Sequence, residues 1–213
     1  MSLLDFLRNK NNKSVEMESN INYDEVLDKK HELRMGNQIW MIDNLNVECY
    51  LNGDSVPEVK DKYEWENLNT GAWCYYDNDK GNGDKTGKLY NWYALNDSRG
   101  LAPLGWHIPN GGEFQTLLKI INGNEKALKI FLQRTEFGSG SNDIGHTNLF
   151  SGTRNYDGKF ANPRFFIQYW TTSEISQSVA YSLLMSLNDY FFCGLVTNKK
   201  TFGFSVRCIK NKQ

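Results

Sequence analysis

The stretch GWHIPNGGEFQTLLKII, residues 105–121, carries the clearest structural signal in the chain. Asn110 stands where a side chain can cap the free amides of a helix, and Glu113 can reach back to the capping residue. The apolar residues that follow recur at helical spacing: Phe114, Leu117, Leu118 and Ile121. The pattern therefore predicts a helix with one buried face, which starts next to Asn110.

Outward from this helix, the sequence predicts a second helix and two strands. Residues 124–134 carry apolar side chains at the same helical spacing. Toward the C-terminus, apolar and polar residues alternate over 181–187 and again over 202–208, which predicts two antiparallel strands with one buried face. On this pattern Cys208 points into the core, where a thiol packs as a small hydrophobe.

The N-terminal part differs from the rest of the chain in its pattern of apolar and polar residues. Residues 1–20 place a few apolar side chains at helical spacing ahead of a polar stretch, so we expect a short leader helix and a flexible linker; a frayed terminus fits equally well. The folded domain then covers residues 21–213, where closely spaced glycines favour an α+β fold with many turns. Residues 22–33 suit either a helix capped by Asn22 or a hairpin that turns at Asp28, and the sequence leaves both open.

Composition excludes several classes of protein. Lys plus Arg number 24 and Asp plus Glu number 25, so the chain lacks the basic surplus of a nucleic-acid-binding protein. The four cysteines form no C-x-x-C pair and there are only three histidines, which argues against a zinc module and against a disulfide-dense scaffold, although one or two disulfides would fit. We find neither a run long enough to span a membrane nor the apolar segment of a Sec signal.

Seven motifs follow one another along the chain. They are MGNQIWMIDNLN (35–46), WCYYDND (73–79), GKLYNWYAL (87–95), GWHIP (105–109), SGTRN (151–155), YWTTSE (169–174) and GFSVRCI (203–209). In this order they resemble the Fibrobacter succinogenes major paralogous domain family over residues 33–210. Family members often carry a cysteine just before the GWHIP segment, whereas residues 101–104 hold none.

The resemblance implies a fold and leaves the activity undefined. The implied fold is an α+β domain of the C-type lectin-like or formylglycine-generating-enzyme-like type, with a mixed antiparallel sheet, two helices and long loops. Members of the family are usually exported or held at the cell surface, whereas this chain shows no Sec signal, so we assign no location.

In the C-terminal part, aromatic residues alternate with residues that carry amide or carboxylate side chains. These segments are the candidate ligand-binding loops. Tyrosine gives a large contact area at low entropic cost, and asparagine adds adaptable hydrogen bonds. By analogy with lectin-like folds, the candidate ligand-binding residues are Arg154, Asn155, Tyr156, Tyr169, Glu174, Asn188 and Tyr190. Four tryptophans are instead expected in the core: Trp40, Trp92, Trp106 and Trp170.

The acidic loop 77–84 is the candidate metal site. Asp77, Asp79 and Asp84 could supply oxygens to calcium. The loop fails as an EF-hand, because Gly81 stands where an oxygen ligand is expected and Lys88 where a bidentate acid is expected. We therefore favour a solvated turn, since Asp, Asn and Gly are also the residues that turns select.

His107 and the cysteines are the groups that could carry catalysis. His107 lies between two large apolar residues, which favours a structural hydrogen bond to a backbone carbonyl over acid–base chemistry. Cys193 and Cys208 lie in apolar surroundings, so neither is expected to be an exposed, low-pKa thiolate. This argues against an oxidase that needs a reactive thiol pair or a thiolate-bound copper.

Together these observations predict a non-enzymatic binding or adhesion module that recognises a carbohydrate or protein ligand through its C-terminal loops. The alternatives are a relative of the formylglycine-generating oxidases and a structural docking unit. Two accessible, low-pKa cysteines or bound copper would favour the oxidase. A partner that binds residues 1–20 alone would favour the docking unit.

Overall fold

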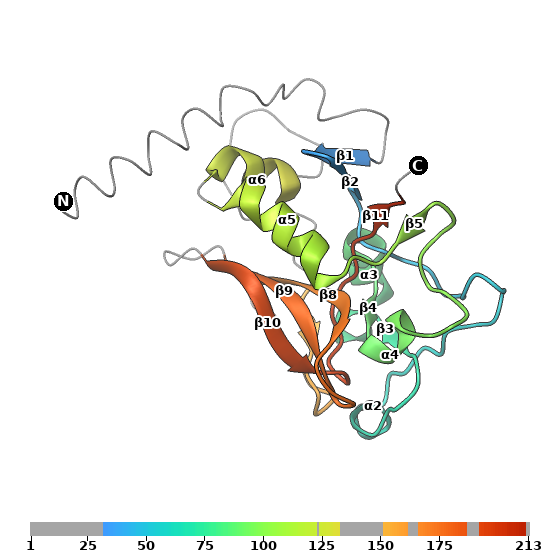
Figure 1. Ribbon diagram of the computed structural model, residues 1–213. Coiled ribbons are helices and arrows are strands. Elements are labelled where there is room, and N and C mark those ends of the chain that lie inside the picture. Colours follow the sequence, from blue (N-terminus) through green and yellow to red (C-terminus); the bar gives the residue numbers. More distant parts are fainter. Residues whose placement is uncertain (1–31, 123, 133–150, 162–165, 187–191, 212–213) are drawn as a thin grey trace, which may run out of the picture.

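The computed structural model describes residues 32–122, 124–132, 151–161, 166–186 and 192–211. These residues form several small antiparallel sheets and five short α-helices, which agrees with the expected α+β class (Figure 1). Single parallel bridges, such as that between Tyr169 and Ser205, make the pairing mixed. None of the described helices is long and apolar enough to cross a membrane. The leader and the ambiguous segment before residue 32 lie outside the described residues.

The elements are short and their bounds are as follows. The strands are β1 (Glu32–Met35), β2 (Gln38–Met41), β3 (Trp73–Cys74), β4 (Leu89–Tyr90), β5 (Trp106–His107), β6 (Thr153–Arg154), β7 (Phe160–Ala161), β8 (Phe166–Glu174), β9 (Val179–Ser186), β10 (Phe192–Lys199) and β11 (Ile209–Lys210). The α-helices are α2 (Lys62–Glu66), α3 (Lys80–Thr86), α4 (Trp92–Leu95), α5 (Gly111–Ile121) and α6 (Glu125–Leu132). The sheets have the orders β1-β2-β11-β5 and β10-β9-β8, with the pairs β3-β4 and β6-β7 apart from them.

Helix α5 begins as the sequence predicts. The Asn110 side chain accepts a hydrogen bond from the Glu113 amide at 3.0 Å, and the Glu113 carboxylate accepts one from the Asn110 amide at 2.9 Å. Phe114, Leu117 and Ile121 are buried. Helix α6 is confirmed as well, with its predicted apolar side chains in the same core. The shorter helices α2, α3 and α4 were not predicted.

The three-stranded sheet β10-β9-β8 packs against α5 and α6 (Figure 1). In the core between them, the Trp40 ring from β2 lies 5.1 Å from Phe114 and 5.7 Å from Phe131. The predicted strand around residues 181–187 is confirmed as β9, with Leu183 and Met185 buried. Its partners are β8 and β10, and not the 202–208 segment.

The segment 202–208 crosses the centre of the molecule, and its prediction as a strand is wrong, because only isolated bridges form there, at residues 203–205. The expectation of one buried face is wrong as well. Residues 204–208 are each at most 1% exposed. Phe204, Val206 and Cys208 belong to a second core cluster, so the predicted burial of Cys208 is confirmed. Arg207 faces the first cluster, where its guanidinium lies over the Phe131 ring. The alternation is therefore real, but both faces are covered.

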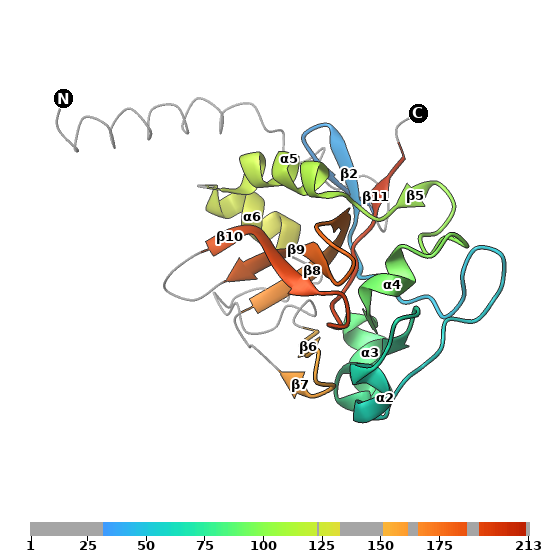
Figure 2. The ribbon, with the colours of Figure 1, turned by 60° about the horizontal axis from the view of Figure 1, so that its bottom comes forward.

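The core tryptophans largely follow the prediction. Trp40, Trp92 and Trp170 are at most 2% exposed, whereas Trp106 is only half-buried beside Lys210. The indoles of Trp92 and Trp170 donate to the backbone oxygens of Thr171 and Tyr90. Figure 2 shows α2, β6 and β7 together on the side of the molecule that lies away from α5 and α6.

Candidate functional site

The β6–β7 hairpin is anchored by Arg154, which the sequence placed on the ligand surface. That prediction is wrong, because the Arg154 side chain is 0% exposed. Its guanidinium donates to four backbone carbonyls: Gly158 (3.0 Å), Val59 (2.6 Å), Lys60 (2.8 Å) and Asp61 (3.0 Å). A planar fork of donors is suited to several acceptors at once, so Arg154 joins the hairpin to the chain that leads into α2.

Aromatic rings enclose this guanidinium. The Arg154 guanidinium carbon lies 4.4 Å from the Trp65 ring centroid and 4.9 Å from that of Phe160. The Trp65 indole in turn donates to the Thr201 carbonyl at 2.7 Å. Gly158 has φ +74°, and a Cβ there would lie 2.3 Å from the Lys62 carbonyl oxygen. The hairpin, α2 and the turn after β10 are therefore held together closely.

Tyr156 lies at the tip of this hairpin and remains accessible. Its residue is 44% exposed, and its ring packs edge-on against Phe202 with centroids 5.5 Å apart. The Lys199 ammonium lies 3.9 Å from the Tyr156 ring centroid, which is a cation–π contact. The ring is thus exposed on one side and supported on the other.

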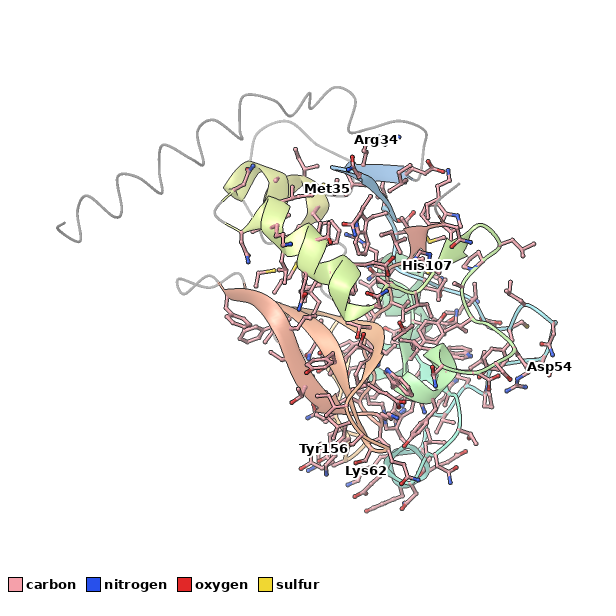
Figure 3. All side chains as sticks on the ribbon, viewed as in Figure 1. Arg34, Met35, Asp54, Lys62, His107 and Tyr156 are labelled. Carbon is pink, nitrogen blue, oxygen red and sulfur yellow. The ribbon has the colours of Figure 1, made fainter. Side chains whose placement is uncertain are left out.

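A second exposed tyrosine lies on α2, next to the hairpin. Tyr63 is 67% exposed, and the Lys62 ammonium lies 4.7 Å from its ring centroid. Figure 3 shows Lys62 and Tyr156 at the same end of the molecule. We call the set Lys62, Tyr63, Tyr156, Lys199 and Phe202 the Tyr156 surface. Three separate segments of the chain contribute to it.

Glu174 lies at the end of the sheet that borders the Tyr156 surface. Glu174 of β8 pairs with Ala180 of β9. On the other side of β9, Lys199 of β10 pairs with Val179, the residue before Ala180. The Glu174 carboxylate accepts a hydrogen bond from Lys200 at 2.6 Å and is otherwise exposed. Glu174 therefore remains a candidate for ligand contact.

The other predicted ligand-binding residues are Tyr169, Asn155, Asn188 and Tyr190, and they differ in where they lie. Tyr169 is 0% exposed, and burial raises the pKa of its hydroxyl, so its prediction as a surface residue is wrong. Asn155 is half-buried and closes the hairpin turn, because its amide donates to the Lys159 carbonyl at 2.7 Å. Asn188 and Tyr190 lie outside the described residues.

The acidic loop contains the start of helix α3. Asp79 is the N-cap of α3, and its carboxylate accepts a hydrogen bond from the Gly81 amide at 2.8 Å. No group of three or more His, Cys, Asp or Glu side chains that could hold a metal occurs within the described part of the chain. Asp77, Asp79 and Asp84 therefore do not form one.

His107 is held by two side chains, and the expected hydrogen bond to a backbone carbonyl is wrong. Its Nδ1 lies 2.7 Å from the Asn211 side-chain oxygen, and its Nε2 lies 2.8 Å from the Glu113 carboxylate. Glu113 is also the capping-box acid of α5. The His107 ring thus links β5 to the start of α5 through Nε2 and to the C-terminal segment through Nδ1.

The four cysteines are free thiols. Burial raises the pKa of Cys74, Cys193 and Cys208 to about 12, whereas Cys49 is exposed. A thiol of such high pKa stays protonated at neutral pH and is a poor nucleophile. The prediction that Cys193 and Cys208 lack low pKa values is confirmed.

Sequence reasoning missed Lys62, Tyr63, Lys199 and Phe202 as surface residues. Phe202 was assigned to the buried face of a strand. The motif SGTRN did point to the hairpin region, because it ends directly before Tyr156. Nothing in a single sequence tells which aromatic rings of distant segments meet at the surface.

Comparison with known proteins gives one match. The family model of the Fibrobacter succinogenes major domain matches residues 33–210. No curated protein and no solved structure matches the chain. The matched range contains all seven motifs and the elements of the described fold, except for Glu32 at the start of β1. The chain belongs to the Fibrobacter succinogenes major domain family.

Proposed function

We propose that this domain is a non-enzymatic binding module of the C-type lectin-like type, whose carbohydrate or protein ligand contacts the Tyr156 surface. The observation that carries the proposal is the Tyr156 ring, which is 44% exposed although Phe202 and Lys199 support its inner side. An exposed aromatic ring whose backbone and neighbouring side chains are already held in place loses little conformational entropy when a ligand binds.

The frame beneath the ring supports this proposal. Arg154 satisfies four carbonyls and the hairpin closes on itself through Asn155 and Gly158, so the loop that bears Tyr156 is held on both sides. Preorganised aromatic groups at the centre of a contact are the usual sources of binding energy.

The polar groups around the rings indicate how the ligand would be oriented. Lys62 and Lys199 lie against tyrosine rings, and the Glu174 carboxylate is exposed at the neighbouring end of the sheet. Hydroxyl groups of a sugar, or the backbone of a peptide, can hydrogen-bond with such a mixture of donors and acceptors. Tyr63 adds a second ring for contact.

The test is a glycan and peptide array probed with the purified full chain, once with calcium and once with a chelator. We expect saturable binding to one class of sugar or peptide, unchanged by the chelator, because Asp79 is used as a helix cap. Binding that disappears with the chelator would restore the acidic loop as a site. A well-folded protein that binds neither array would contradict the proposal.

A further inference from the structure

Lys88 is a charged side chain in an aromatic enclosure. It follows the Gly87 turn and directly precedes β4, and it is only 2% exposed. Its Nζ lies 4.5 Å from the Trp73 ring centroid and 4.9 Å from that of Tyr75. An amine that is removed from water in this way is the kind that proteins use as a nucleophile.

Two side chains from one short segment meet this amine. Lys88 Nζ donates to the side-chain carbonyl oxygen of Asn46 at 2.6 Å, and it lies 3.3 Å from a carboxylate oxygen of Glu48. The backbones are adjacent as well, because the Lys88 amide donates to the Leu45 carbonyl. An amine, a carboxamide and a carboxylate thus share one point at the edge of the second core cluster.

We propose that Lys88 and Asn46 form an intramolecular isopeptide bond, with Glu48 as the proton carrier. Glu48 takes a proton from the Lys88 ammonium, and the free Nζ attacks the side-chain carbonyl carbon of Asn46. As the new C–N bond forms, Nζ gives up its second proton to solvent; the old amide C–N bond breaks, and Glu48 returns its proton to the departing nitrogen. One ammonia leaves, no electrons are transferred and no further reactant is needed.

Proximity and exposure favour this reaction. Contact at hydrogen-bond distance makes the attack intramolecular, which replaces a large part of its entropic barrier. A carboxylate within reach supplies general acid–base catalysis. Asn46 and Glu48 are both exposed, so ammonia can escape into solvent, and either side chain can be replaced without opening the core.

The chain contains a matched control in Lys200. Lys200 is nearly buried, lies 3.9 Å from the Trp92 ring centroid and contacts the Glu174 carboxylate at 2.6 Å. It has no side-chain amide among its contacts in the described residues. Lys200 therefore reproduces the burial, the ring and the carboxylate of the Lys88 site, and lacks only the group to be attacked.

The experiment is intact mass spectrometry of the purified full chain after incubation at neutral pH, followed by peptide mapping. We expect a mass lower than that of the sequence by one ammonia in most molecules, and a branched peptide that joins the segments with Asn46 and Lys88. Asn46→Ala and Glu48→Gln should each have the full mass of their sequence. Lys200→Ala should keep the ammonia deficit.

One side reaction gives the same change in mass. Asparagine followed by glycine, as at Asn52, Asn82, Asn110 and Asn122, can lose ammonia to form a succinimide, but it gives no branched peptide. The variant Asn52→Ala should therefore keep both the deficit and the branched peptide. A wild-type chain with the full mass of its sequence would overturn the proposal, as would an ammonia deficit without the branched peptide that joins Asn46 to Lys88.

Discussion

Arg154 shows how a single residue fixes the geometry of the candidate surface. Because its guanidinium serves four carbonyls in an enclosure made by Trp65 and Phe160, its loss would leave several acceptors without a donor. Each buried carbonyl that is left without a donor lowers the free energy of unfolding by about 1–3 kcal/mol. We therefore expect Arg154→Ala to lower the free energy of unfolding by about 3 kcal/mol or more.

Urea unfolding followed by circular dichroism measures this loss. Lys159→Ala is the matched control, because Lys159 lies in the same hairpin and its exposed side chain pairs with the Asp157 carboxylate at the surface. We expect the control to change the free energy of unfolding by less than about 0.5 kcal/mol. An equally small effect of Arg154→Ala would mean that the hairpin does not depend on its anchor.

The buried thiols give a prediction about pH. The pKa of Cys74 and of Cys208 rises from an ordinary value of 9.0 to about 12 in the folded chain, because burial disfavours the thiolate. Between these values the unfolded chain loses thiol protons that the folded chain keeps. The contribution of these thiols to stability is thus complete below pH 9.0 and is lost as the pH rises toward 12.

The same burial decides reactivity. At neutral pH we expect a thiol reagent to label Cys49 rapidly in the native protein, and the three thiols of raised pKa only after unfolding. Labelling with and without denaturant, read by mass spectrometry, makes the comparison. Two rapidly labelled cysteines in the native chain would favour the oxidase alternative over a binding module.

Among the elements, helix α5 starts at a capping box, in which the cap and the third helical residue bond to each other. Asn110 and Glu113 satisfy each other's amides, and Glu113 also holds His107. We expect Asn110→Ala to lower the free energy of unfolding by about 0.5–2 kcal/mol, because the first turn of the helix loses its acceptor. Gln115→Ala, an exposed change within the same helix, should have little effect in the same denaturant titration. Equal stabilities of the two variants would contradict this role.

The sequence could predict the elements that have a long, regular pattern. Helices α5 and α6 carry apolar residues at helical spacing, and β9 carries an apolar–polar alternation that Ala180 and Leu184 interrupt. Strands of two residues, such as β3 and β4, are too short to show any period. In the 202–208 segment apolar and polar residues do alternate. Such an alternation indicates which side chains share a face, but it does not indicate whether the other face is exposed to solvent.

The candidate surface was predicted in part for a related reason. Tyr156 and Glu174 are accessible, while Arg154 and Tyr169 have polar atoms that suit a ligand equally well and are buried. Whether an arginine faces solvent or backbone carbonyls depends on contacts such as that with Val59, far away in the sequence. Residue type alone does not carry that information.

At the scale of the whole molecule, the 202–208 segment links the two main core clusters. Phe204 packs on Trp170 in one cluster, while the neighbouring Arg207 contacts Phe131 in the other. We expect Phe204→Ala to lower the free energy of unfolding by about 3–5 kcal/mol. Because both clusters share this segment, tryptophan fluorescence and far-ultraviolet circular dichroism should shift together in one transition. Separate transitions would show that the clusters unfold independently.

The central claim is that the Tyr156 surface binds a ligand, and calorimetric titration of the strongest array ligand tests it most directly. For Tyr156→Ala we expect a loss of affinity of about tenfold or more, which corresponds to about 1.4 kcal/mol or more. Leu51→Ala, which removes an exposed apolar side chain outside the Tyr156 surface, should leave the affinity unchanged. An unchanged affinity of a folded Tyr156→Ala variant would contradict the claim.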